Sequence, residues 1–224
     1  MITEDHFYPV NGVCLHTVEA GDAVGNFILF LHGFPEFWYG WKNQISFFVQ
    51  KGFRVIIPDQ RGYNLSSKPP GVKSYCIQHL VADIVALIRS LTSKKIVLVG
   101  HDWGGVVAWQ VALHHPQLVY QLIIINMPHP EVFRQTLRKS LAQLLRSSYA
   151  AFFQLPVLPE WISRAFEYKL LQRSLLKTAN KGAFSKADIA MYKKAWRQPG
   201  ALTAMINWYR AYKYNKSTTS GTIQ

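Results

Sequence analysis

The chain has 224 residues, of which 49 % are hydrophobic and 17 % charged, so it can form one substantial core but not two full-sized domains, and it does not have the composition of a disordered, collagen-like or coiled-coil protein. The net charge of +13 is concentrated late in the chain, because residues 1–130 hold 9 basic and 8 acidic residues whereas residues 131–224 hold 16 and 4. This asymmetry is typical of a surface for nucleic acid or anionic membrane, or of a chain that lacks compensating acidic sequence.

The first 130 residues have the pattern of an α/β protein. Residues 7–18 form two extended runs around Asn11-Gly12, a pair that favours a type I′ hairpin turn. Further short apolar runs lie at 27–31, 54–57, 96–99 and 122–125, and helical patterns lie between them at about 39–50, 75–91 and 104–114. Strands that alternate with helices predict a mostly parallel sheet, here with an antiparallel hairpin at its start.

From about residue 131 the pattern becomes helical and basic. Amphipathic helices are predicted over 133–153, 161–176 and 186–196, and no strand-like run follows them. We therefore divide the chain into a core over residues 1–130, a helical cap over 131–216 and the start of a further core segment over 217–224.

Targeting and cofactor signals are weak. Cys14 and Cys76 form no paired motif, which favours a reducing compartment. The N-terminus is acidic where a signal peptide would be basic, and no apolar run approaches the roughly 20 residues of a membrane span. The eight histidines form no helical metal-binding pair. We expect a cytoplasmic protein without a membrane span, a metal or another cofactor.

The most informative motif is Gly100-His101-Asp102-Trp103-Gly104, which follows an apolar strand and opens a helix. It fits the nucleophile elbow G-x-Nuc-x-G with Asp102 as the nucleophile, since small flanking residues permit a tight turn that lifts the central side chain above the strand ends. The alternative is an aspartate that only caps the helix.

Four motifs occur in order along the chain: HGFPEFWYGW (32–41), PDQRGYNLSSKP (58–69), GHDWGG (100–105) and NMPHP (126–130). Together they resemble the epoxide hydrolase branch of the α/β-hydrolase family, over about residues 5–214. Asp rather than Ser at the elbow excludes the esterase and lipase branches. Haloalkane and haloacid dehalogenases share an Asp elbow, so the motif does not decide whether the leaving group is an epoxide oxygen or a halide.

The resemblance implies further site residues. The loop after the first parallel strand would lie beside the elbow, and the backbone N–H groups of Phe34 and Trp103 would form an oxyanion hole. Taken alone, this loop is only a turn containing Gly and Pro. We expect Pro35, Trp38 and Phe153 to contact the substrate.

Aspartate suits attack at a saturated carbon. A carboxylate is ionised at neutral pH and can open an epoxide without a base, forming an alkyl ester that water must then hydrolyse. The departing ring oxygen needs a proton donor. Family members use two cap tyrosines, and Tyr149 and Tyr209 match their positions. The alternative is that both only pack in a core, as aromatic side chains on helices commonly do.

The resemblance also implies residues that this sequence lacks. In the family a catalytic acid and a catalytic histidine follow the cap, whereas here the last histidine is His129. Asn126 occupies the alternative position for the acid after the sixth strand. His32 and His101 are expected to make structural hydrogen bonds, and Asn64 replaces a usual glycine in a left-handed turn. The last strands of the fold are therefore expected to be missing, which would leave a central strand as an exposed edge.

Three hypotheses follow. The first is a truncated epoxide hydrolase whose substrates are a small apolar epoxide and water. The complete enzyme would release a diol, whereas the 224-residue chain would stop at the Asp102 ester. The second is an Asp-nucleophile dehalogenase with the same defect. The third is a non-catalytic fragment or basic binding module, which the absence of a nucleic-acid motif disfavours.

Overall fold

The computed structural model describes residues 3–132, 136 and 148–215. Its six strands form one sheet in the order β1-β2-β4-β3-β5-β6. The strands are β1 (Glu4–Val10), β2 (Val13–Ala20), β3 (Asn26–Leu31), β4 (Phe53–Pro58), β5 (Ile96–His101) and β6 (Val119–Ile125). β2 pairs antiparallel with β1 and β4, and the other pairs are parallel. The predicted α/β fold is confirmed.

The N-terminal hairpin has the predicted turn. Asn11 and Gly12 both have positive φ angles, 45° and 76°, as a type I′ turn requires. Val10 and Val13 are therefore paired directly across the turn. Asn64 likewise has a positive φ of 38°, so the loop after β4 keeps its left-handed residue despite the missing glycine.

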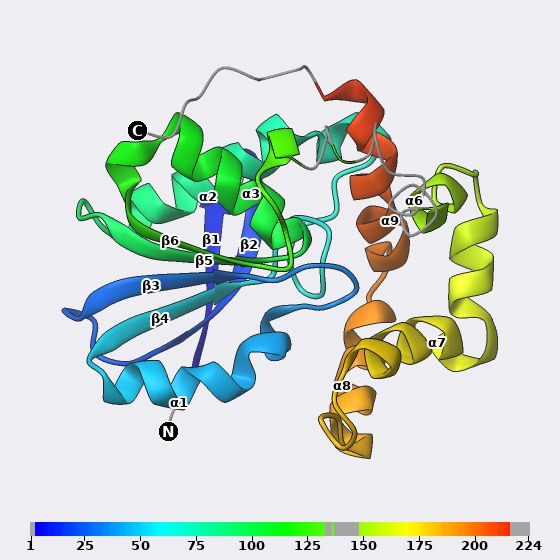
Figure 1. Cartoon of the computed structure of the whole chain (residues 1–224), viewed down its shortest axis with the longest axis horizontal. Helices are drawn as coiled ribbons and strands as arrows, with labels where there is room; N and C mark the ends of the chain where they lie inside the picture. The colour runs from blue at the N-terminus through cyan, green and yellow to red at the C-terminus, as the bar shows by residue number, and fades with distance from the viewer. Residues whose placement is uncertain (1–2, 133–135, 137–147, 216–224) are drawn as a thin grey trace.

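Helices cover both faces of the sheet (Figure 1). α1 (Lys42–Gln50) lies on one face, while α2 (Ile77–Leu91) and α3 (Trp103–His114) lie on the other. Because neighbouring side chains of a strand point to opposite faces, β3 supplies both cores. Leu29 packs in the cluster with α2 and α3, whereas Ile28 packs in the cluster with α1.

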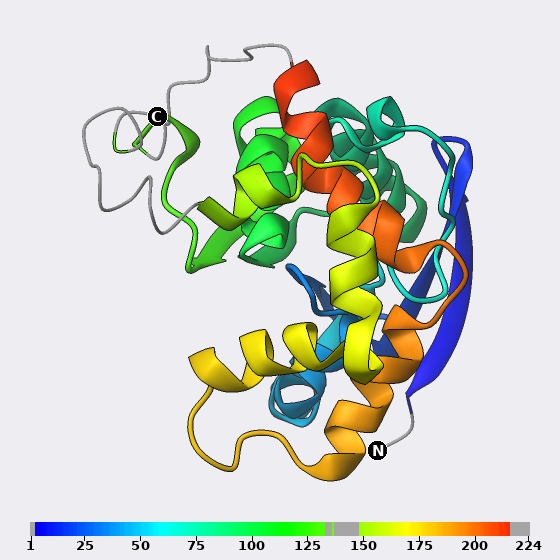
Figure 2. The ribbon, with the colours of Figure 1, turned by 90° about the vertical axis from the view of Figure 1, so that its right-hand side faces the viewer.

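The remaining described helices form a layer beside the carboxyl ends of the parallel strands (Figures 1 and 2). They are α6 (Ser148–Phe152), α7 (Leu158–Thr178), α8 (Lys186–Trp196) and α9 (Ala201–Ala211). We call residues 148–215 the helical layer. Two indole groups attach it to the core, since Trp196 Nε1 donates to Pro35 O at 2.7 Å and Trp208 Nε1 donates to Arg61 O at 3.0 Å.

The helices after residue 131 are only partly as predicted. Most of the helix predicted over 133–153 lies outside the described residues. The described part consists of Thr136 and residues 148–153, which include α6. The helix predicted over 161–176 is interrupted at 165–168, where three residues adopt left-handed angles. This break brings Tyr168 against Trp196, with ring centroids 6.0 Å apart, and Glu167 into an ion pair with Arg197. α9 was not predicted as a separate helix.

β6 is an edge strand in the described part of the chain, with β5 as its one sheet neighbour. Its apolar residues are only half-buried, and Tyr120 is 76 % exposed. No helix among the described residues is long and apolar enough to cross a membrane.

Candidate active site

Asp102 stands at the turn between β5 and α3 with φ 52° and ψ −121°. The small residues around it are required by close backbone approaches. A Cβ on Gly104 would lie 2.3 Å from Leu31 O, and one on Gly100 would lie 2.6 Å from Gly104 O. The Asp102 side chain makes no capping hydrogen bond to α3. The tight turn and its small flanking residues have the geometry expected of an elbow.

The loop after β3 holds the Asp102 carboxylate. Phe34 N–H donates to Asp102 Oδ1 at 2.9 Å. A Cβ on Gly33 would lie 2.4 Å from the same oxygen, so only glycine permits this approach. Burial raises the pKa of Asp102, whereas hydrogen bonds from the backbone N–H groups of Phe34 and Trp103 lower it. The two N–H groups expected to form an oxyanion hole therefore both lie against this carboxylate.

A cavity of about 230 Å³ opens above Asp102. Its lining is mostly apolar and comes from both the core and the helical layer: Asp102, Trp103, Val106, Met127, Pro130, Tyr149, Ala150, Gln154, Tyr209 and Tyr212. The predicted nucleophile and both predicted tyrosines therefore share one cavity.

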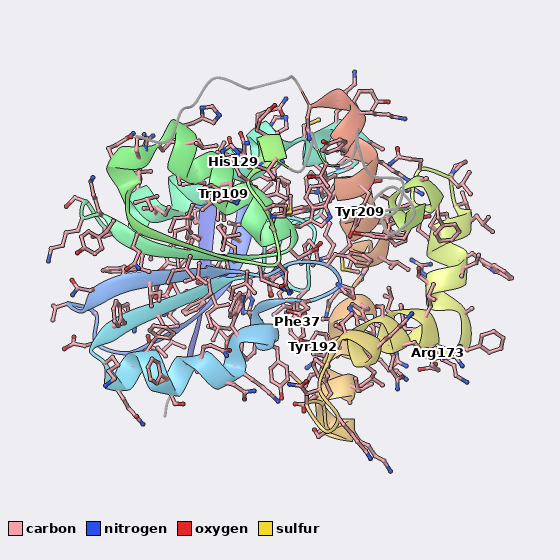
Figure 3. The ribbon with its side chains drawn as sticks, viewed as in Figure 1. Phe37, Trp109, His129, Arg173, Tyr192 and Tyr209 are labelled. Carbon is pink, nitrogen blue, oxygen red and sulfur yellow. The ribbon has the colours of Figure 1, made fainter. Side chains whose placement is uncertain are left out.

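Tyr149 comes from α6 and Tyr209 from α9, with ring centroids 5.8 Å apart. Tyr209 is buried where α9 meets the core (Figure 3), and its ring packs edge-on against Trp103 at 5.2 Å. Burial and the nearby Asp102 charge raise the pKa of both tyrosines. Both hydroxyls thus stay protonated at neutral pH and can act as hydrogen-bond donors.

The three residues expected to contact substrate do not line this cavity. Pro35 accepts a hydrogen bond from Trp196 through its carbonyl. Trp38 donates its backbone N–H to Asp59 Oδ1 at 3.0 Å. Phe153 lies behind Tyr209, with ring centroids 4.9 Å apart. Of the three, Phe153 packs against the lining residues Tyr149 and Tyr209.

Sequence reasoning missed several lining residues. Met127 and Pro130 lie in the loop after β6, in the NMPHP motif that was noted only for its resemblance. Trp109 Nε1 donates to Met127 O at 3.3 Å, and the Trp109 and His129 rings pack edge-on at 5.1 Å (Figure 3). Val106, one helical turn after Asp102, could have been found from its spacing on α3.

Buried polar contacts hold the loops that carry the site. His32 Nδ1 lies 3.0 Å from Gly33 O, and its Nε2 accepts from Gln60 N–H at 3.1 Å. Burial lowers the pKa of His32 to about 4, so this ring is neutral. Asp59 Oδ2 lies 2.7 Å from both His16 Nδ1 and Asn64 Nδ2. The predicted structural role of His32 is confirmed.

His101 also makes structural contacts. Its Nδ1 lies 4.0 Å from Glu36 Oε2, and its Nε2 lies 3.4 Å from Asn126 Nδ2. Asn126 directly follows β6 with a positive φ of 58°. In the described part of the chain, no histidine lines the cavity, and no three His, Cys, Asp or Glu side chains are grouped to hold a metal ion.

Comparison with known proteins matches the chain to α/β hydrolases. A family model described as alpha/beta hydrolase fold matches residues 26–214. AB hydrolase superfamily protein YfhM of Bacillus subtilis is 50 % identical over 207 residues, which are 92 % of this chain and 72 % of that protein. Epoxide hydrolase 4 of Mus musculus is 41 % identical over 206 residues, or 89 % of this chain and 57 % of that protein.

Solved structures agree. An epoxide hydrolase of Bacillus megaterium in complex with an inhibitor superposes with a TM-score of 0.86 at 36 % identity, covering 95 % of this chain and 73 % of that one. Epoxide hydrolase VrEH1 of Vigna radiata gives 0.82 at 32 % identity, covering 97 % and 74 %. The chain spans little more than half the length of several curated relatives, including the mouse protein.

Proposed function

The chain belongs to the α/β-hydrolase family, and we propose that it opens epoxides with Asp102 as a covalent nucleophile. One observation carries the proposal: a carboxylate and two protonated tyrosine hydroxyls line the same small, mostly apolar cavity. The epoxide hydrolases among its relatives and structural neighbours support the substrate class.

In the first step, an Asp102 carboxylate oxygen attacks a ring carbon of the epoxide. A new carbon–oxygen ester bond forms while the ring carbon–oxygen bond breaks, and its electron pair remains on the departing oxygen. A proton from Tyr149 or Tyr209 neutralises that oxygen as a hydroxyl. The cavity of about 230 Å³ suits a small apolar epoxide.

In the second step, water attacks the carbonyl of the Asp102 ester and releases a diol. The N–H groups of Phe34 and Trp103 already lie against this carboxyl group and would stabilise the oxyanion. The attacking water must lose a proton to a base. The described cavity lining offers no histidine for this, so we assign ring opening, and not ester hydrolysis, to the described residues.

The proposal predicts a stoichiometric adduct. Incubation with styrene oxide, followed by intact-mass measurement, should show one added epoxide per chain. The matched variant Asp102→Asn keeps the size of the side chain but removes the carboxylate, so it should show none. A folded wild type that forms no adduct would refute the nucleophile or the substrate class. An adduct with an alkyl bromide but not with styrene oxide would favour the dehalogenase alternative.

A further inference from the structure

We infer that Arg210 is a positioning residue that holds Tyr149 and Tyr209 at the spacing needed for proton donation. The inference rests on the proposed function. The two tyrosines belong to helices far apart in the sequence, yet their rings lie 5.8 Å apart above Asp102. Something must therefore fix α6 against α9.

The two tyrosines are held unequally. Tyr209 is 5 % exposed and packs against Phe34, Trp103 and Phe153. Tyr149 is 49 % exposed, and its ring contacts are Phe153 and Tyr209. Packing therefore fixes Tyr209, whereas the place of Tyr149 depends on how α6 is anchored.

Arg210 supplies that anchor from the position next to Tyr209. Its Nε donates to Phe153 O at 3.0 Å, and its Nη2 donates to Leu155 O at 2.5 Å. Nη1 and Nη2 donate to the two Glu160 carboxylate oxygens at 2.5 and 2.9 Å. Nη1 also lies 3.3 Å from Asn207 Oδ1. These five contacts match the five N–H groups of a guanidinium.

The anchored carbonyls are those of the turn that ends α6. Phe153 follows that helix directly and Leu155 lies two residues further on, so fixing their carbonyls fixes its C-terminal end. A second bond acts in the same direction, since Gln154 Nε2 donates to Tyr209 O at 2.9 Å. The turn is thus attached to both residues of the Tyr209-Arg210 pair.

Glu160 explains why the anchor is rigid. This carboxylate comes from α7, is buried, and forms a bidentate pair with Arg210. A bidentate pair fixes the orientation of the guanidinium as well as its position. Lysine would keep the charge but has one nitrogen, so it cannot reach both carbonyls and both carboxylate oxygens.

The test is the rate of adduct formation at saturating styrene oxide, followed by rapid quenching and intact-mass measurement. Arg210→Met should slow ring opening about tenfold, and Arg210→Lys should slow it less, because one anchoring contact can be kept. Arg173→Met is the matched control, because Arg173 is exposed on α7 far from Tyr209 (Figure 3). Its rate should equal that of the wild type.

A double-mutant cycle separates positioning from mere folding. In a Tyr149→Phe background the place of α6 no longer affects proton donation, so Arg210→Met should slow the reaction less than about twofold. Equal slowing in both backgrounds, or no slowing in a folded Arg210→Met or Arg210→Lys protein, would overturn the inference. If the wild type itself forms no adduct, the proposed function fails instead.

Discussion

The reactivity of Asp102 is set by opposing influences on one carboxyl group. Burial raises its pKa above the ordinary 3.8, while two backbone N–H groups act against that rise. In the proposed mechanism, the same N–H groups would become oxyanion donors once the carboxylate is esterified. Glycines surround Asp102 because a Cβ at these positions would clash with the neighbouring backbone or with the carboxylate itself.

The pH dependence of ring opening follows from this balance. Only the ionised carboxylate attacks, so the rate should rise with pH to a plateau, with a midpoint above 3.8 because burial raises the Asp102 pKa. The rate should stay level through neutral pH, because the pKa values of Tyr149 and Tyr209 are raised above 10. Adduct formation measured across a pH series tests this. A rate that falls between pH 6 and 8 would implicate a different titrating group.

Gly33 offers a sharper residue-level test. In Gly33→Ala the added methyl would lie 2.4 Å from Asp102 Oδ1, so the carboxylate must move and ring opening should slow by about a hundredfold or more. Gly182→Ala is the matched control, because a Cβ there meets nothing within 4 Å. It should lose about 1 kcal/mol of stability from its positive φ but keep the wild-type rate. Equal rates for the two variants would contradict the described contact.

Residues in local motifs were predictable, whereas residues brought together by the fold were not. Asp102 sits in a turn whose glycine spacing is visible in the sequence. Pro35, Trp38 and Phe153 are aromatic or rigid residues in or near the motifs, but they are not among the residues that line the cavity. Tyr212 reaches the cavity because η4 (Tyr212–Tyr214) follows α9. This placement depends on how α9 packs against the core, and no local sequence pattern indicates it.

At the scale of elements, Asp188 attaches the start of α8 to the core, in addition to the Trp196 hydrogen bond at its end. Asp188 forms a reciprocal capping box with Ser185 and also accepts from Tyr39 Oη at 2.8 Å. Lys42 forms an ion pair with the same carboxylate. The hydrogen bond from Lys42, followed by those from Ser185, lowers the pKa of Asp188.

Asp188→Ala should therefore lower the free energy of unfolding by about 1 kcal/mol at neutral pH, through loss of the cap and its partners. A lowered pKa means that the stabilisation is present above the ordinary 3.8 and is lost as the pH falls toward the folded value. Urea unfolding of wild type and variant should show the difference shrinking below that pH. Lys186→Ala, an exposed change on the same helix, should have little effect.

The two differences between predicted and observed helices have separate physical causes. A period of 3.6 residues reveals a helix with one buried stripe, and α2 was found in this way. α9 is buried on most sides, with nine of its residues buried, so it shows little contrast between faces. The break in α7 depends on Tyr168 and Glu167 meeting α8, which no local pattern reveals.

Across the whole molecule, alternating strands and helices predicted the mostly parallel pairing, whereas the strand order β1-β2-β4-β3-β5-β6 came from the structure. The charge asymmetry did not need a nucleic-acid surface to be understood. The described acidic residues of the helical layer, Glu160, Glu167 and Asp188, each pair with a basic residue. Among the described residues of the helical layer, exposed basic side chains such as Arg173 contribute to the surplus.

The β6 edge predicts self-association of the 224-residue chain. Backbone groups on an open edge can pair with another strand, and the exposed Tyr120 and Ile125 add apolar surface. Sedimentation velocity should show species larger than a monomer that increase with concentration. Replacing both side chains by lysine should shift the distribution toward monomer, whereas Val24→Lys, at an exposed position in the loop between β2 and β3, is the control. A wild type that stays monomeric at high concentration would contradict this expectation.

The most direct test of the account is to locate the covalent bond. After incubation with styrene oxide and proteolysis, peptide mass mapping should place the added group on Asp102 through an ester, and Tyr149→Phe and Tyr209→Phe should each slow its formation. Modification at another residue, or on Asp102 at a rate that neither tyrosine affects, would contradict the proposed mechanism.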